Sequence, residues 1–220
     1  MVINNQIDLI LKKYSFLTFN NGKRCFIGVI QVDEDDKYNL KIDINNTSFF
    51  PKVYELEDRI PKKADRHINS DNSLCFTTKV NELVLLKTKV KDLISFFNLV
   101  LVPYLLNNSF YEINKFYKFG EYSHNPHIAT YETYCDILNI DNFDLISTLL
   151  NQVSKGRKIR PNTICFCGSG IKIKKCKNHE TGYRNLKKIT IEKLSADSLK
   201  IKELRDYLIN MKNNTVPNTV

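Results

Sequence analysis

The sequence lacks the features that take a protein to a membrane or across one. Its first six residues contain neither the basic nor the apolar segment of a signal peptide. The longest apolar run, Leu93 to Leu106, is interrupted by Pro103, and a bilayer span needs about twenty apolar residues. We therefore expect this run to form a core helix in a cytoplasmic protein that has no membrane partner.

Two further absences limit the reactions that we expect of this chain. The chain has no Gly-rich phosphate loop and no adenylation domain, so we do not expect it to activate a carboxylate by itself. Because an export signal is also missing, its six cysteines are not expected to form a disulfide framework. We therefore interpret Cys25, Cys75 and Cys135 as free thiols.

The charged residues are distributed unequally along the chain. Residues 1–151 hold 17 Lys/Arg against 19 Asp/Glu, a net charge of −2, whereas residues 152–220 hold 16 against 5, a net charge of +11. The composition predicts a main domain over 1–151, a basic linker over 152–162 and a basic appendage over 163–220. Nucleic acid is an acidic partner that fits such an appendage, although a solvated charged surface is the more common explanation.

Hydrophobic periodicity predicts an α+β fold. Apolar residues at helical spacing from Ile3 to Leu17 predict an N-terminal helix that ends near Asn20. Strands are then expected at 24–32, 40–44 and 49–56. Helices are expected at 90–101 and 128–150, and Pro103 should kink or end the first of them. A last helix, capped by Ser195, is expected to carry on one face the apolar residues Ile201, Leu204, Leu208 and Met211.

The polar loop that ends at Cys75 is the first candidate site. A basic cluster at 62–66 precedes it, and His67 and Asn69 lie between that cluster and the cysteine. Neighbouring cations and amide donors lower the pKa of a cysteine, which favours a reactive thiolate. Free cysteine is also among the most buried residue types, so a packed and inert thiol stays open on the chemistry alone.

Three short stretches resemble the core of a ubiquitin-conjugating enzyme: Phe49-Phe50-Pro51, His67-Ile68-Asn69 and Ser73-Leu74-Cys75. The resemblance covers residues 1–150. In that family a His-Pro-Asn box precedes the catalytic cysteine, whereas here Ile68 replaces the proline and the loop to Cys75 is shorter than usual. With the string Phe-Gly-Glu-Tyr-Ser-His at 119–124, these departures are similar to the bacterial members that accompany CBASS anti-phage operons.

This resemblance implies a ubiquitin-conjugating-enzyme-like fold with an N-terminal helix, an antiparallel β-meander and C-terminal helices. It also implies acyl transfer, in which Cys75 accepts the C-terminus of a partner protein as a thioester and passes it to an amine. Asn69 would then stabilise the oxyanion or brace the loop, and His67 would hold the loop. The implied partner is a cGAS/DncV-like nucleotidyltransferase in CBASS antiviral defence, together with a separate activating enzyme or an already activated donor.

The basic appendage carries the second candidate site. Its residues Cys165, Cys167, Cys176 and His179 have the spacing Cys-x-Cys-x8-Cys-x2-His, which resembles the SEC-C zinc motif. Three thiolates and one imidazole make a closed tetrahedral set for a structural Zn²⁺ ion, with no open position for a catalytic water. Uncoordinated or disulfide-bonded cysteines are the alternative.

Two other functions stay open. In one, Cys75 is a packed thiol and the fold is a non-catalytic scaffold; trapping of a thioester would distinguish the two. In the other, the basic appendage binds nucleic acid together with its zinc knuckle, the segment from Cys165 to His179. This segment lacks the exposed aromatic residues, interleaved with cations, on which the bases of a single strand would stack. His124 and His127 could act near the thiol as acid–base groups, but hydrogen-bonded structural histidines are the simpler interpretation.

Overall fold

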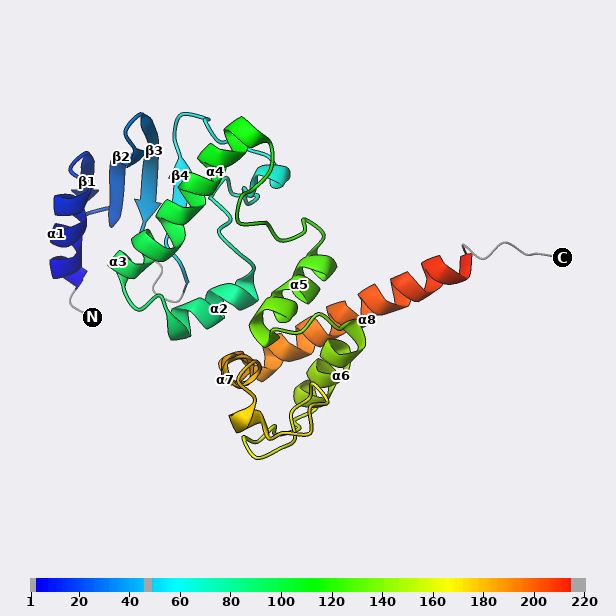
Figure 1. Cartoon of the computed structure of the whole chain (residues 1–220). Helices are drawn as coiled ribbons and strands as arrows, with labels where there is room; N and C mark the ends of the chain where they lie inside the picture. Colours follow the sequence, from blue (N-terminus) through cyan, green and yellow to red (C-terminus); the bar gives the residue numbers. More distant parts are fainter. Residues whose placement is uncertain (1–2, 46–48, 215–220) are drawn as a thin grey trace. The chain divides into compact units, whose positions relative to one another are not determined.

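A computed structural model describes residues 3–45 and 49–214, so the outer ends of the predicted domains lie outside the described residues. The chain forms two compact units (Figure 1). Unit 1 comprises residues 1–77 and 85–121, and unit 2 comprises residues 78–84 and 122–220. Helix α2 (Lys79–Thr88), for which the sequence analysis gave no element, contributes residues to both. This division places the boundary before the helices expected at 128–150, and not after them at 151 as the sequence predicted.

Unit 1 has the expected α+β composition. A single antiparallel sheet follows the first helix and has the strand order β1-β2-β3-β4, which is a meander. Its elements are α1 (Ile3–Lys13), β1 (Leu17–Asn20), β2 (Cys25–Asp33), β3 (Asp36–Asp43) and β4 (Lys52–Glu55). Along β3, Tyr38, Leu40 and Ile42 are buried and alternate with more exposed residues, because successive side chains of a strand point to opposite faces.

The sequence predicted an N-terminal helix that is too long. Helix α1 ends at Lys13, well before Asn20, and Leu17 already belongs to strand β1. Leu17 is buried, so its position fits the apolar spacing of a helix as well as the inner face of a strand. Strand β1 pairs Leu17 with Gly28, and a Cβ at Gly28 would lie 2.1 Å from the carbonyl oxygen of Phe16. The close approach of β1 to β2 therefore requires glycine at this position.

The apolar run forms one helical stretch composed of α3 (Leu93–Phe96), a π-helical turn η2 (Phe97–Leu101) and α4 (Val102–Asn114). The helix does not end at Pro103. The proline ring and its missing N–H disturb the preceding turn, and the wider π turn accommodates that disturbance. By length and composition, this is the stretch among the described residues that could cross a membrane. Its residues Phe96, Phe97, Val100, Leu101 and Leu105 are buried in the core of unit 1, as expected for a core helix.

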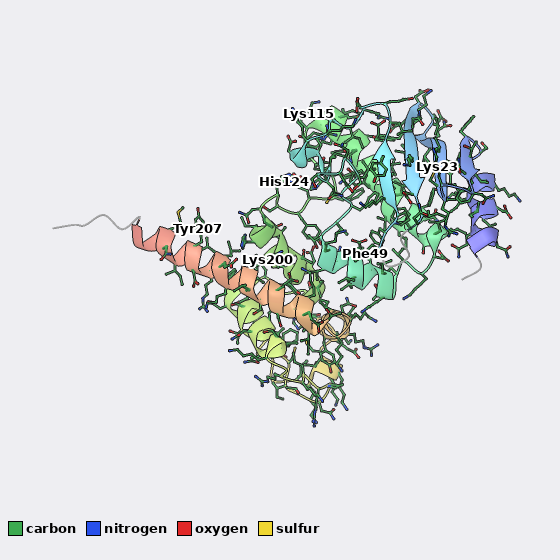
Figure 2. The ribbon with its side chains drawn as sticks, turned by 180° about the vertical axis from the view of Figure 1, so that it is seen from behind. Lys23, Phe49, Lys115, His124, Lys200 and Tyr207 are labelled. Carbon is green, nitrogen blue, oxygen red and sulfur yellow. The ribbon has the colours of Figure 1, made fainter. Side chains whose placement is uncertain are left out.

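Unit 2 is helical. It contains α5 (Pro126–Leu138), α6 (Phe143–Ser154), the short 3₁₀ turn η3 (Ile173–Lys175), α7 (Glu180–Leu186) and α8 (Ile191–Asn214). Helix α8 begins before Ser195, so that residue does not cap it; the hydroxyl of Thr190 accepts from the N–H of Lys193 instead. Ile201 and Leu204 are buried, whereas residues 205–211 are exposed, among them Leu208 and Met211, and Figure 2 shows Tyr207 extending from α8.

Candidate functional site

The segment from His67 to Cys75 forms a closed loop in unit 1. The N–H of Cys75 donates to the carbonyl oxygen of His67 at 2.7 Å, and Ile68 pairs with Leu74 as an isolated antiparallel bridge. The N–H of Leu74 donates to the carbonyl oxygen of Val53 at 2.8 Å, which ties the loop to strand β4. The loop therefore places Cys75 beside the main chain of His67.

The side chain of Asn69 lies across this loop. Its Nδ2 donates to Oγ of Ser73 at 3.1 Å and to the carbonyl oxygen of Leu74 at 3.2 Å, and its backbone N–H donates to the carbonyl oxygen of Ser73 at 2.8 Å. A carboxamide has two N–H donors, and both have acceptors here. Of the two roles implied for Asn69, this geometry supports bracing of the loop.

His67 is held from two sides. Its carbonyl oxygen accepts from Oη of Tyr104 at 3.0 Å as well as from Cys75, and its Nε2 lies 2.8 Å from a carboxylate oxygen of Glu121. Its backbone has a φ of 52°, in the left-handed region that non-glycine residues adopt infrequently. A strained residue with this many partners is fixed by its surroundings, which is consistent with a loop-holding role.

Asp71 is a loop residue that the sequence analysis missed. Its carboxylate accepts from Nζ of Lys52 at 2.5 Å and from the backbone N–H and Oγ of Ser73 at 3.1 and 2.6 Å. The hydrogen bond from Lys52, followed by those from Ser73, holds the pKa of Asp71 well below its usual value. An Asp in a polar loop favours an Asx turn, in which its carboxylate accepts from the backbone N–H two residues on, and this preference could have identified the contact.

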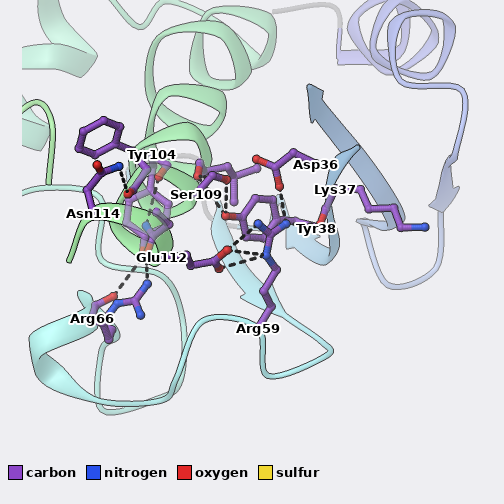
Figure 3. A network of polar contacts seen from close by, with 12 residues as sticks. Asp36, Lys37, Tyr38, Arg59, Arg66, Tyr104, Ser109, Glu112 and Asn114 are labelled. Atoms are coloured by element: carbon purple, nitrogen blue, oxygen red, sulfur yellow. Dashed lines mark hydrogen bonds and ion pairs between the residues drawn. The ribbon is translucent and has the colours of Figure 1, made fainter. Parts of the chain in front are cut away.

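Arg66 does not belong to an exposed basic cluster beside the thiol. It is buried, and its guanidinium donates to Oδ1 of Asn108 at 3.0 Å and to Oη of Tyr117 at 3.3 Å, 4.2 Å above the ring of Tyr111. Figure 3 shows Arg66 together with Arg59, whose guanidinium pairs with Asp36 and Glu112. Arg66 therefore anchors the start of the loop to helix α4.

The three cysteines outside the knuckle lie in different environments. Cys25 is fully buried in strand β2. The Cys135 thiol lies in helix α5, and its own burial raises its pKa. Cys75 is half-buried at the end of the loop, with its Sγ 4.0 Å from the carbonyl oxygen of Thr77. Because a thiolate is the reactive form, Cys25 and Cys135 have the poorer settings for reaction.

The second candidate site gathers Cys165, Cys167, Cys176 and His179 in unit 2, and their donor atoms all lie within 4.8 Å of one another. The Nδ1 of His179 is 3.1 Å from Sγ of Cys176 and 3.6 Å from Sγ of Cys165, and the sulfurs of Cys167 and Cys176 are 4.0 Å apart. A tetrahedron with metal–sulfur bonds of about 2.3 Å has edges of roughly 3.7 Å. The four residues can therefore hold one metal ion.

Local backbone geometry forms this knuckle. Ile164 pairs with Lys172, and the N–H of Cys165 donates to the carbonyl oxygen of Ile171 at 2.7 Å. Gly168 and Gly170 complete the turn at φ values of 76° and 73°, which side chains disfavour. The turn brings the first two cysteines close to the last two ligands.

A contact outside the ligand set orients His179. Its Nε2 lies 3.2 Å from the carbonyl oxygen of Asn139, the left-handed residue that ends helix α5. In the neutral imidazole, donation from Nε2 to this carbonyl would leave the lone pair on Nδ1, which is directed at the thiols, as a metal ligand requires. The sequence gave no signal for this contact.

His127 lies in unit 2, where its Nε2 is 2.8 Å from a carboxylate oxygen of Glu203 and links α5 to α8. This pair agrees with the interpretation of His127 as a hydrogen-bonded structural residue.

No protein-family model matches the chain, and no curated protein or solved structure matches it significantly.

Proposed function

We propose that the chain is an acyl carrier with a ubiquitin-conjugating-enzyme-like fold, in which Cys75 forms a thioester with the C-terminus of a partner protein and passes it to an amine. The observation that carries this proposal is the closed loop that ends at Cys75, fixed by the hydrogen bond to His67 and by the amide of Asn69. Cysteine is intrinsically a strong nucleophile at neutral pH, and a half-exposed thiol on a fixed loop can meet an incoming carbonyl group.

The order of elements in unit 1 supports the fold part of the proposal. Helix α1 precedes a four-stranded antiparallel meander, the loop to Cys75 follows β4, and helices come after it. This is the order that the resemblance to ubiquitin-conjugating enzymes implies.

The proposed reaction has two steps. In the first, the thiol of Cys75 loses its proton to solvent, its sulfur attacks the carbonyl carbon of an activated C-terminus, a C–S bond forms, and the leaving group departs with its electron pair. In the second, an amine attacks the same carbon, a C–N bond forms, the Cys75 thiolate leaves, and the amine loses a proton to solvent. The thioester preserves the activation between the steps.

Two residues of the loop assist this chemistry by position. Asn69 holds the segment between Ser73 and Leu74 in place, and the main chain of His67 receives the N–H of Cys75. Both residues act through the position of Cys75, since precise placement of reacting groups contributes strongly to rate.

The partner part of the proposal rests on the resemblance to the bacterial CBASS proteins. It assigns a cGAS/DncV-like nucleotidyltransferase as the owner of the C-terminus, with a separate activating enzyme as the supplier of the activated donor. For the knuckle we propose a structural Zn²⁺ ion, because three sulfurs and one imidazole nitrogen are the ligands that zinc prefers in closed tetrahedral sites.

A peptide with a C-terminal alkyl thioester tests the proposal without an activating enzyme. The sulfur of Cys75 should displace the alkyl thiol from the peptide and form a thioester adduct, seen on a non-reducing gel and by mass spectrometry, that an excess of a small thiol such as dithiothreitol cleaves by exchange. Cys75→Ala should form no adduct, whereas Cys135→Ala, the matched control, should react like the natural chain. An adduct that persists in Cys75→Ala, or its absence from both proteins, would contradict the proposal.

A non-catalytic scaffold is the second candidate, and one observation favours it. Both N–H groups of the Asn69 amide are occupied within the loop, so the amide has no donor left for an oxyanion. On this alternative, native-state alkylation labels Cys75 no faster than Cys25, and Cys75→Ala lowers the stability of unit 1.

A further inference from the structure

A cavity of about 350 Å³ lies in unit 2, and its lining includes neither residues of the loop of Cys75 nor the four candidate metal ligands. The end of α6, the linker, α7 and the start of α8 form its apolar wall, through Val153, Ile159, Leu186, Ile189 and Leu194. Cavities of this size hold small molecules. The lining residues include no Asp, Glu, Asn, Gln, Ser or Thr, so a polar ligand body would find few side-chain partners there.

Four cations line the same cavity: Arg157, Lys158, Arg160 and Lys187. Within the described part of the chain none of them pairs with a carboxylate; Arg157 bonds to the neutral Gln152, and Lys187 lies 4.5 Å over the ring of Tyr183. All four are exposed. Residues 152–191 hold eleven Lys/Arg and one Asp/Glu, so this stretch of the chain carries a strong net positive charge.

We propose that this cavity binds a small anionic molecule with an aliphatic body, such as a medium-chain fatty acid. The aliphatic chain would occupy the apolar wall, and the carboxylate would lie among the four cations. Burial of the chain and relief of the repulsion among the cations both favour binding. A nucleotide fits less well, because the hydrogen-bonding edge of its base would lose water and gain few side-chain partners.

The knuckle supports one wall of the cavity. Oη of Tyr183 donates to the carbonyl oxygen of Ile159 at 2.6 Å, and both residues pack in the small core around Cys165, Ile173 and Cys176. The linker segment is therefore held against α7. This proposal uses residues of unit 2 alone and does not depend on thioester chemistry at Cys75.

Calorimetric titration of the full, metal-loaded chain with octanoate tests the proposal. We expect a dissociation constant on the order of 1 mM or tighter, in keeping with the free energy that a ligand of this size can supply. 1-Octanol, which has the same chain and no charge, should bind at least tenfold more weakly. Octanoate affinity should fall at least tenfold in the double variant Arg157→Gln/Arg160→Gln.

The matched control is Lys174→Gln/Lys175→Gln, which removes two exposed cations of the knuckle that do not line the cavity. Its octanoate affinity should equal that of the natural chain, and circular dichroism should show that both variants stay folded. Equal affinities of the two double variants, equal binding of octanol, or no saturable octanoate binding would overturn the proposal. Binding of a single-stranded oligonucleotide that both variants weaken alike, without octanoate binding, would assign the surface to nucleic acid instead.

Discussion

Gly182 lies where helix α7 meets the end of α5, and its replacement by alanine tests how the metal site depends on packing. A Cβ at this position would lie 2.7 Å from the carbonyl oxygen of Ile137 and 2.8 Å from Cα of Leu138. Ordinary contacts begin at 3.4 Å, so α7 must move away by about 0.7 Å, since the atoms it meets are backbone. The glycine therefore permits the close contact.

The cost can be estimated from opposing effects. Overpacking of this kind costs about 1–3 kcal/mol, and alanine in place of glycine inside a helix returns about 1 kcal/mol. We expect Gly182→Ala to lower the free energy of unfolding of unit 2 by on the order of 1 kcal/mol. Helix α7 begins directly after His179, so the same shift moves a metal ligand by more than the roughly 0.2 Å that metal–ligand distances tolerate.

Two measurements check this prediction. Urea unfolding followed by circular dichroism should show the loss of stability, and competition with a colorimetric chelator should show at least a tenfold loss of zinc affinity. Thr181→Ala is the matched control, because Thr181 is the exposed neighbour of Gly182 in the same helix. If Gly182→Ala and Thr181→Ala match the natural chain in both measurements, the packing argument is wrong.

Three further outcomes are expected. Chelation of the metal should raise hydrogen exchange across 163–185 and leave unit 1 protected, because the ligands hold that segment together; loss of protection in unit 1 would contradict its independence. Because the folded-state pKa of Asp71 is depressed, its stabilisation of the loop is fully present above the unfolded pKa of about 4 and is lost as the pH falls toward the lower folded value. The protection of the Ser73 amide, compared with Asp71→Asn, should follow that dependence, and identical pH profiles of the two proteins would refute it. Arg66→Met leaves the buried side chain of Asn108 without its donor and should cost about 1–3 kcal/mol in urea unfolding of unit 1, whereas an unchanged midpoint would exclude an anchoring role.

The local elements of this protein were largely predictable. Strands β2 and β3 follow from β-branched and alternating residues, since alternation reports one buried face. The cluster of possible metal ligands follows from the spacing between Cys165 and His179, because a short segment that turns on itself can bring all four side chains together. The loop before Cys75 follows from its polar composition. Each of these signals lies within a few consecutive residues, and so the sequence alone carries it.

The unit boundary and the partners of the site residues were decided by the tertiary structure. Asn139 lies 40 positions from His179, and Asn108 lies 42 positions from Arg66, so no local pattern joins these pairs. Composition grouped α5 and α6 with the main domain, but burial of their apolar faces against α8 places them in unit 2. The packing of distant segments decides which surfaces meet. The pattern of apolar residues along the chain shows only that an apolar face must be buried, and not which element buries it.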